Sequence, residues 1–208
     1  MRITAVEESK NLKGKLLVYI DGSYSFTISQ EDYFSLNLYE DKELTGDDID
    51  YIRNIVIFRA AKNTAIKYLS LKMRSSGEVY RKLKDEGYGD DVIGKVIEEL
   101  KSMGYINDQV YAGKFINDRM KLKPKSKKML KMELQNKGID EDVINEALNE
   151  AEIDDLQTAK QLLVKKFGNY DLKDEKVRRK AYTYLYNRGF GYNLADRIIN
   201  SLSERQRS

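Results

Sequence analysis

The densest group of charged side chains is the stretch KFINDRMKLKPKSKKMLK, at residues 114–131. It carries eight basic side chains against one acid, Asp118, for a net charge of +7. Lysine and arginine at this density can contact phosphates or an acidic groove on a protein. The alternative is a solvated loop in a lysine-rich chain. We expect a binding role for six of these lysines: Lys121, Lys123, Lys125, Lys127, Lys128 and Lys131.

Two further stretches carry basic side chains. The stretch KVRRKAYTYLYNR, at residues 176–188, combines arginines and lysines with three tyrosines. It adds three arginines to the candidate site: Arg178, Arg179 and Arg188. Residues 74–84 have a similar basic character and add two more: Arg74 and Arg81. Matching basic faces of this kind would form a basic stripe along the chain.

The composition gives little support to enzymatic chemistry. The chain has no histidine and no cysteine, which removes the commonest general base, the thiolate nucleophile and the commonest metal ligands. It has no phosphate loop of the G-x-x-x-x-G-K-S/T type, no dinucleotide glycine fingerprint and no metal-ligand cluster. We therefore expect a protein that is not an enzyme, with no catalytic residue, no metal and no cofactor.

Charge is unevenly distributed along the 208 residues. Residues 1–55 carry 6 basic and 11 acidic side chains, whereas residues 56–208 carry 31 and 23. An acidic front and a basic body favour a polyanionic or acidic partner. No apolar run approaches the roughly 20 residues that span a bilayer, and the first residues lack an apolar signal-peptide core. We expect a cytoplasmic protein without membrane contact.

The elements that position these side chains recur along the chain. The stretches LKDEGYG, LQNKGID and LYNRGFG place Gly87, Gly138 and Gly189 at equal intervals of 51 residues. Similarity at a fixed period is the signature of a repeat architecture. Glycine favours the positive φ that often follows a helix. Each copy is therefore predicted to have a helix that ends near the glycine, a turn and a further helix.

Apolar columns in the repeat predict its core. Ala65, Ala112 and Ala159 align at intervals of 47 residues and mark a first helix in each copy. After each glycine, apolar residues fall at i, i+1, i+4, i+5 and i+8, which is one helix face. Two columns end the predicted core: Met73, Met120 and Phe167 in the first helix, and Leu100, Ala151 and Leu202 in the last. Because one three-helix unit buries little, we expect stacked copies to share buried surface in an elongated, curved array.

Polar residues at the predicted helix starts have capping chemistry. Ser75 with Glu78 fits a capping box, and Ser126 and Asp174 stand at the corresponding places of the later copies. One further column lies just before the third helix of each copy: Asp91, Asp142 and Asn193. Because an active site would not be triplicated in this way, the column indicates capping rather than catalysis.

The front of the chain is predicted to be β structure followed by a helix. KLLVYI and YSFTIS flank Asp21 and Gly22, a pair that is typical of a tight hairpin turn, and RITAV can add a third strand. We expect the hairpin to lean on the helix that follows, since two strands alone are marginal. Thr45 with Asp48 predicts the start of that helix, which runs for about 25 residues with a candidate break near Arg59.

The fold class predicted from these patterns is mainly α. Three tandem three-helix repeats form an elongated curved array, with a small N-terminal β-hairpin element. The predicted boundaries are residues 1–55 for the N-terminal extension, and 56–107, 108–152 and 153–208 for the three repeats.

Two tyrosines of the last copy are predicted to be exposed. Tyr184 and Tyr186 each share a column with polar residues of the other two copies. An exposed aromatic ring can stack on a base or anchor a protein contact, so both tyrosines join the candidate site. The alternative is that they cover the end of the last copy.

Several stretches, in this order, resemble the signature motifs of the RecX family of recombinase regulators. They are YLSLKMRSSGEVYRKL at 68–83, GYINDQVYAGKFINDRM at 104–120, KMELQNKGI at 131–139 and YLYNRGFGY at 184–192. The resemblance covers about residues 57–202, and the acidic front resembles an extension of longer members. At LKPKSKK the chain departs from the family, which usually shows glycines there.

The resemblance implies tandem three-helix repeats that lie in the groove of a RecA filament on single-stranded DNA. Members inhibit ATP hydrolysis and strand exchange or promote filament disassembly, and some bind single-stranded or double-stranded DNA. The expected partners are therefore the RecA filament and DNA, with the chain acting as a monomer. The alternative is a stand-alone DNA-binding module, which tight DNA binding without RecA would support.

Overall fold

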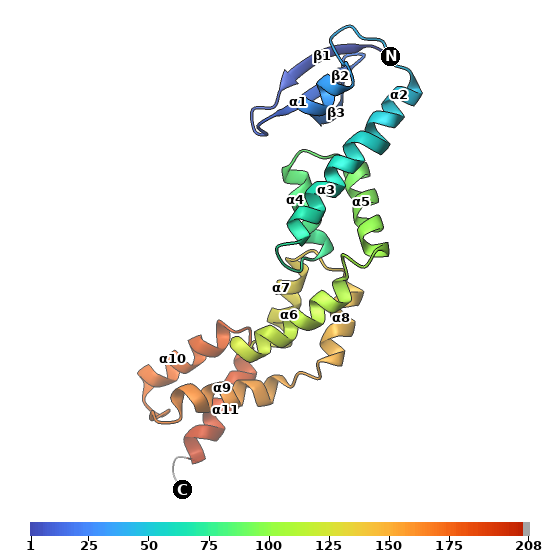
Figure 1. Ribbon diagram of the computed structural model, residues 1–208. Coiled ribbons are helices and arrows are strands. Elements are labelled where there is room, and N and C mark those ends of the chain that lie inside the picture. Colours follow the sequence, from blue (N-terminus) through green and yellow to red (C-terminus); the bar gives the residue numbers. More distant parts are fainter. Residues whose placement is uncertain (206–208) are drawn as a thin grey trace. The chain divides into compact units, whose positions relative to one another are not determined.

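The computed structural model describes residues 1–205, which divide into two compact units (Figure 1). The N-terminal unit is Met1–Asn107 and the C-terminal unit is Asp108–Ser208. Most of the described residues are helical, as the periodicity predicted. Among them, no helix has the length and apolar character needed to cross a membrane.

A small antiparallel sheet opens the N-terminal unit. Its strands, β1 (Ile3–Glu8), β2 (Lys15–Ile20) and β3 (Ser23–Ser29), lie side by side in the order β1-β2-β3. The predicted hairpin turn is confirmed, because Asp21 and Gly22 have positive φ angles of 48° and 79°. The predicted third strand is also confirmed.

The helix after the sheet begins where its capping residues predicted. The side chain of Thr45 accepts a hydrogen bond from the Asp48 backbone N–H, and Asp48 bonds back to the Thr45 N–H, which completes a capping box. The helix runs through α2 (Gly46–Tyr51), a π-helical segment (Ile52–Ile57) and α3 (Phe58–Leu69). A short preceding helix, α1 (Gln30–Ser35), was not predicted.

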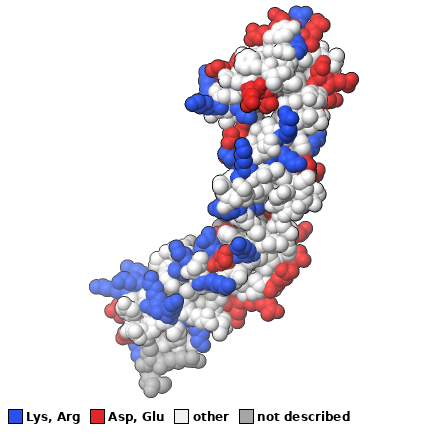
Figure 2. Space-filling view, in the orientation of Figure 1, with Lys and Arg blue, Asp and Glu red and all other residues white. Residues whose placement is uncertain are grey.

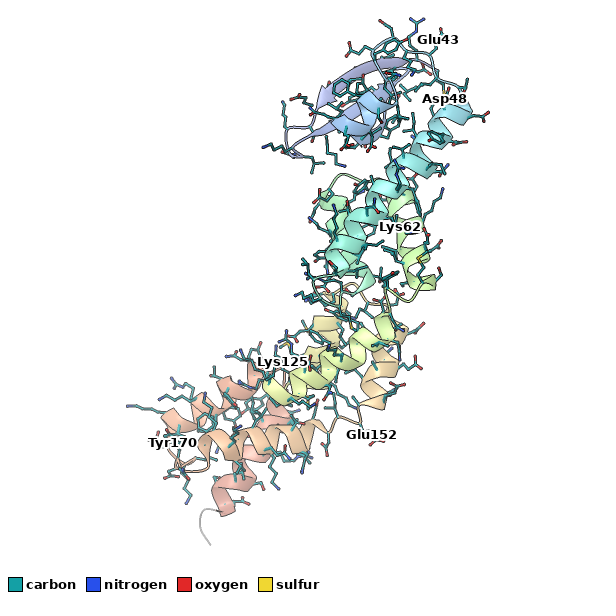
Figure 3. The ribbon with its side chains drawn as sticks, viewed as in Figure 1. Glu43, Asp48, Lys62, Lys125, Glu152 and Tyr170 are labelled. Atoms are coloured by element: carbon teal, nitrogen blue, oxygen red, sulfur yellow. The ribbon has the colours of Figure 1, made fainter. Side chains whose placement is uncertain are left out.

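Two predictions for this helix were wrong. The irregularity is a π-helical turn at Ile52–Ile57 rather than a break near Arg59. The helix also ends at Leu69, so Met73 lies beyond it and is 46% exposed instead of buried. Lys62 of α3 pairs with Glu99 at 2.6 Å (Lys62 is labelled in Figure 3).

The first copy of the repeat comprises α3, α4 (Ser76–Asp85) and α5 (Asp90–Ser102). Its buried side chains form one apolar cluster with those of the sheet, including Val18, Phe26, Ile57, Val79 and Ile93. The prediction that the hairpin leans on the helix after it is therefore confirmed. Sheet and first copy share a single core.

The second and third copies make up the C-terminal unit. The second contains α6 (Asp108–Leu122), α7 (Lys127–Gln135) and α8 (Glu141–Glu150). The third contains α9 (Asp155–Phe167), α10 (Glu175–Tyr186) and α11 (Tyr192–Arg205). Each has its own buried cluster, one around Leu130 and Ile144 and the other around Leu163 and Phe190. The expected shared apolar core is wrong for these two copies, because their apolar clusters are separate. The buried contact between them is polar instead, made by Ser126 with the Arg188 and Gly189 carbonyls.

Most of the predicted apolar columns are buried. The leading alanines Ala65, Ala112 and Ala159 and the leucines before each glycine are inaccessible to solvent. Ala151 is an exception, because α8 ends at Glu150 and leaves that residue exposed. The repeat alignment could not detect a helix that stops one turn early.

The predicted caps and glycines are largely confirmed. Ser75, Ser126 and Asp174 accept hydrogen bonds from backbone N–H groups in the first turns of α4, α7 and α10. The three repeat glycines have φ angles of 72° to 86°. The capping role predicted for Asp91, Asp142 and Asn193 is wrong. All three lie inside the first turn, and the caps of α5 and α8 are Gly89 and Asp140.

Candidate interaction surface

The basic stretch at residues 114–131 spans the end of α6, a short loop and the first turns of α7. Lys121, Lys123 and Lys128 are exposed, and Lys127 is half-buried. The loop forms because Pro124 cannot continue α6 and Ser126 caps α7. In Figure 2, basic side chains gather on the side of the C-terminal unit where α6 ends and α10 lies. The surface is thus built at one helix–loop–helix junction.

One glutamate neutralises two of the basic residues in this stretch. Glu133 of α7 accepts a hydrogen bond from Arg119 Nε at 3.0 Å and another from Lys125 Nζ. The Arg119 guanidinium also lies 4.9 Å from the centre of the Phe115 ring. Lys125 is therefore held within the protein by an acidic partner. Its side chain is only 20% exposed.

Lys131 is also paired within the chain. Its ammonium group lies 2.6 Å from Glu141 and 3.2 Å from the Asn145 side-chain oxygen, which joins α7 to α8. The hydrogen bond and charge of Lys131 hold the pKa of the Glu141 carboxyl below its ordinary value. The side chains of four of the six predicted lysines form no ion pair among the described residues: Lys121, Lys123, Lys127 and Lys128. The backbone N–H of Lys127 donates a hydrogen bond to the Asp155 carboxylate at 2.9 Å.

In the third copy, Arg178 belongs to a polar network rather than to open surface. Its guanidinium donates to the Tyr182 hydroxyl at 3.3 Å and to Asp196 at 3.2 Å, and it also bonds Asn200. Tyr182 donates its hydroxyl to Asp196 and stacks on Tyr192, with ring centres 5.3 Å apart. Burial, followed by the bond to Asp196, raises the pKa of Tyr182 to about 12.

A hollow of about 530 Å³ lies between α9 and α10 and brings cations onto an aromatic ring. The Arg188 guanidinium lies 3.7 Å and the Lys166 ammonium 4.5 Å from the centre of the Tyr184 ring. Tyr184 also packs edge-on against Phe167, with ring centres 5.7 Å apart. Exposed Arg179 lines the same hollow.

The exposure predicted for the two tyrosines is therefore half right. Tyr186 is 75% exposed, as predicted. Tyr184 is half-buried, because α9 of its own copy supplies Phe167 and Lys166 against the ring. The polar residues of the same column, Lys82 and Glu133, are themselves half-buried and ion-paired, so polarity in that column did not indicate exposure.

The basic residues of the first copy are largely occupied. Lys82 pairs with Glu86 at 2.6 Å, and Lys84 pairs with Asp90 at 2.7 Å. The half-buried Arg74 stacks on the Tyr68 ring at 4.1 Å. Arg81 is exposed and also interacts within the chain. A basic stripe that runs from this copy into the C-terminal unit stays a prediction.

An acidic edge on α8 of the second copy and on its connection to α9 was not predicted. Residues 139–155 contain eight acids and no basic side chain, a signal that the overall net charge of +3 conceals. Figure 2 shows acidic side chains along the edge of the C-terminal unit that α8 and its connection to α9 form. Despite this density, no cluster of metal-ligating residues occurs among residues 1–205.

Four family models match the chain in sequence order. The Regulatory protein RecX N-terminal domain matches residues 1–45. The first, second and third three-helix domains of RecX match residues 61–100, 107–148 and 152–199. Together they account for both the sheet and the three helical copies.

Relatives and solved structures carry the same description. A Regulatory protein RecX from Clostridioides difficile (strain 630) is 30% identical over 202 residues, covering 96% of this chain and 95% of the relative. Another, from Caldanaerobacter subterraneus, is 30% identical and covers 88% and 91%. A crystal structure of regulatory protein RecX is 25% identical with a TM-score of 0.60, covering 96% and 98%. A RecX structure from Lactobacillus salivarius is 28% identical with a TM-score of 0.59, covering 71% and 97%.

Proposed function

The chain belongs to the RecX family of regulatory proteins, and from this premise we propose that it regulates the RecA recombinase. The proposed action is inhibition through binding along the RecA–single-stranded DNA filament. Such binding would modulate the filament's ATP hydrolysis, strand exchange and stability. The protein would thereby control homologous recombination and DNA repair in the cytoplasm, without chemistry of its own.

The observation that carries this proposal is the group of lysines at the α6–α7 junction whose side chains form no ion pair among the described residues. Lys121, Lys123 and Lys128 are exposed, and half-buried Lys127 stands beside them. A compact group of unpaired cations is suited to DNA phosphates or to acidic side chains in a filament groove. We assign the primary contact to these four residues.

The other candidate residues fall into two groups, those that would contact the partner and those that hold the local fold. Arg179, Arg188 and Tyr186 would add contacts from the third copy, and Arg81 from the first. Lys125, Lys131 and Arg178 hold the site together through their internal partners. Arg74 and Tyr184 likewise serve packing, through Tyr68 and Phe167 respectively. The repeat boundaries at 56–107, 108–152 and 153–208 are proposed as the three binding modules.

Inhibition follows if binding distinguishes between filament states. A regulator shifts an equilibrium only by the difference in its affinity for the two states, however tightly it binds both. Each three-helix copy offers a separate contact to the filament. The copies gain avidity only when the binding sites on the filament are spaced so that the connected copies can bind at the same time. The proposed regulator therefore favours the filament geometry that its copies can engage together.

The test is single-stranded-DNA-dependent ATP hydrolysis by RecA, titrated with this protein at physiological salt. A fall in hydrolysis at well below one protein per RecA monomer supports filament regulation. It also indicates capping or disassembly rather than stoichiometric competition. No effect at excess over both RecA and DNA overturns the proposal. Tight binding to DNA alone would then favour the stand-alone DNA-binding function.

A variant pair separates the contact from the fold. Replacing Lys121, Lys123 and Lys128 by glutamine removes unpaired cations and is expected to abolish inhibition while helix content is retained. The matched control replaces Lys10, Lys13 and Lys72, three exposed lysines of the N-terminal unit, by glutamine and is expected to leave inhibition unchanged. If inhibition survives the first change, the assignment of the site is wrong.

A further inference from the structure

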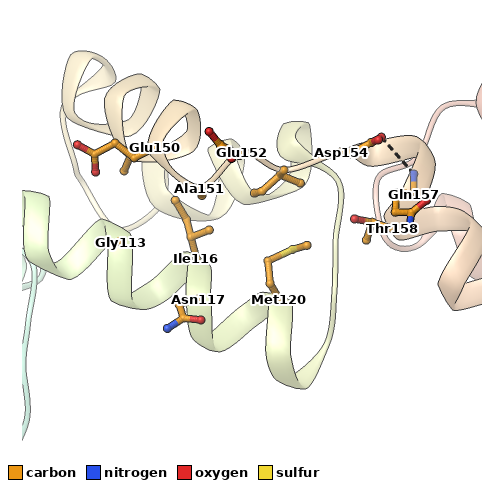
Figure 4. A pocket seen from close by; sticks show the side chains of 12 residues that line it. Gly113, Ile116, Asn117, Met120, Glu150, Ala151, Glu152, Asp154, Gln157 and Thr158 are labelled. Atoms are coloured by element: carbon orange, nitrogen blue, oxygen red, sulfur yellow. Dashed lines mark hydrogen bonds between the residues drawn. The ribbon is translucent and has the colours of Figure 1, made fainter.

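A second hollow of the C-terminal unit differs in character from the basic surface. It has a volume of about 550 Å³ and lies between α6, the end of α8 and the first turn of α9 (Figure 4). Ile116, Met120 and Ile153 line it with apolar side chains. Glu150 and Glu152 add carboxylates to the same lining. The hollow therefore combines apolar surface with negative charge.

Buried Thr158 leaves a hydroxyl group without a partner in this hollow. Thr158 is only 9% exposed and lines the hollow, and its hydroxyl makes no hydrogen bond to any residue in 1–205. Helical threonines commonly bond the carbonyl four residues earlier. Thr64 does so to Ala60 at 2.9 Å, and Thr183 to Arg179 at 3.0 Å. Among the described residues the enclosed side-chain atoms without a partner are Arg74 Nε and Arg188 Nε, so the Thr158 hydroxyl is not sealed from solvent. It faces the hollow and can bond a polar group of a ligand there.

The charge at the rim is not balanced within the protein. Glu150 and Glu152 have no ion pair among the described residues, and residues 139–155 contain no basic side chain. Figure 3 shows Glu152 at the connection between α8 and α9. Glu152 has a φ of 45°, in the left-handed region that favours glycine. A carboxylate is thus present where the backbone alone would favour glycine.

We propose that this hollow binds a basic segment of a partner protein. An apolar side chain of that segment would enter between Ile116, Met120 and Ile153. Lysines or arginines on either side of it would face Glu150 and Glu152, and a backbone or side-chain group would bond the Thr158 hydroxyl. Charge complementarity selects this occupant, because the same carboxylates repel nucleic acid and acidic peptides.

The inference deepens the proposed function and rests on it for the partner's identity. In that setting the basic surface faces DNA or an acidic groove, and the acidic hollow holds a basic segment of the recombinase protein. Both surfaces include residues of α6, but the basic surface is centred on the α6–α7 junction and the hollow on the α8–α9 connection, and they have no residue in common. They can therefore be inactivated separately.

The test uses a fluorescein-labelled synthetic peptide with leucines between lysines, measured by anisotropy against the full chain. Wild type is expected to bind it and to ignore a matched peptide with glutamates in place of the lysines. Glu150→Gln combined with Glu152→Gly is expected to weaken binding about fivefold, as loss of two exposed ion pairs predicts. Glu152→Gly also relaxes the backbone, so misfolding would not explain a loss.

Two further variants sharpen the assignment. Glu146→Gln removes an exposed acid of the same helix outside the hollow and is expected to leave binding unchanged. Thr158→Val keeps the side-chain shape but removes the hydroxyl, and weaker peptide binding is expected without a loss of stability. An equal change in log affinity per charge removed for Glu146→Gln and for the double variant would overturn the proposal, since binding would then follow net charge alone.

Assays of RecA inhibition distinguish failure of the hollow proposal from failure of the proposal that the chain regulates RecA. If the double variant inhibits RecA as wild type does and still binds the peptide, the hollow has no assigned role and only the regulator proposal stands. If wild type inhibits RecA but never binds the basic peptide, the hollow proposal also fails. Self-association of the chain that the double variant abolishes would assign the hollow to a second copy and overturn the proposed occupant.

Discussion

The Ser126 hydroxyl donates a hydrogen bond to the carbonyl oxygen of Gly189 at 2.8 Å, which ties the start of α7 to the end of α10. The same oxygen of Ser126 accepts a bond from the Met129 N–H and so caps α7. A Cβ on Gly189 would lie 2.5 Å from Ser126 Oγ and 2.7 Å from Met129 Cβ. The repeat glycine thus both ends its own helix and permits close approach of the neighbouring copy.

Gly189→Ala is expected to lower the free energy of unfolding by about 1–3 kcal/mol, through an unfavourable φ of 86° and a clash with α7. Urea denaturation followed by circular dichroism measures the loss. Gly191→Ala is the control, because that glycine has open space around it and no positive φ. Equal stability of the two variants would refute the close-approach argument.

Glu133→Gln is expected to strengthen binding to single-stranded DNA. The change frees Arg119 and Lys125 from their shared acid, so two more cations become available. With four lysines in contact, the slope of log affinity against log salt should be about −3, at roughly 0.7 per phosphate contact. In the variant the slope should steepen to about −4. Fluorescence titrations over a range of salt concentrations measure both slopes.

Asp118→Asn is the control for this prediction. It removes one negative charge from the same segment but separates no ion pair among the described residues. Its slope should match that of wild type. If both variants steepen the slope equally, net charge rather than release of the two cations controls DNA affinity.

Stability should fall between pH 10 and pH 12 in a way that depends on Tyr182. The folded pKa of about 12 lies above the ordinary value of 10.0. The contribution of the protonated Tyr182 hydroxyl to the free energy of unfolding is therefore complete below pH 10, and it is lost as the pH rises towards 12. Tyr182→Phe removes the hydroxyl and its bonds to Arg178 and Asp196, at a cost of about 1–3 kcal/mol at neutral pH. The stability difference between wild type and variant should shrink across that window.

The two tyrosines of the last copy should separate binding from stability. Tyr186→Ala changes an exposed ring and should alter stability by less than about 0.5 kcal/mol. It should still weaken DNA binding if a base stacks there. Tyr184→Ala removes packing against Phe167 and should cost about 1–3 kcal/mol. Thermal unfolding and DNA titration of both variants give the comparison, and a stability loss in Tyr186→Ala would contradict it.

Periodicity predicted the helical copies well because burial imposes the same columns on each of them. Leu83, Leu134 and Leu185 are all fully buried at the predicted interval. The π-helical turn at Ile52–Ile57 escaped prediction because it lies outside the repeat and has no proline or glycine to mark it. The apolar periodicity therefore predicted the helices correctly where all three copies pack in the same way.

The candidate site was harder to predict because charge density does not reveal pairing. Glu133 is eight residues from Lys125 and fourteen from Arg119, so only the folded junction of α6 and α7 brings the three together. Likewise, Tyr184 is covered by Phe167 of another helix. The sequence located the basic segment, and the tertiary structure decided which of its lysines remain unpaired.

The separate buried clusters of the second and third copies affect which segments of such a chain can be duplicated or deleted. Duplication or loss of one whole copy would carry its apolar cluster with it and leave no exposed half-core. The contact between neighbouring copies would then form again between the residue that caps one second helix and the glycine that ends another, as Ser126 and Gly189 do here. The first copy lacks this freedom, because its cluster is continuous with the sheet. Gene-length variation in this architecture should therefore accumulate after residue 107 rather than before it.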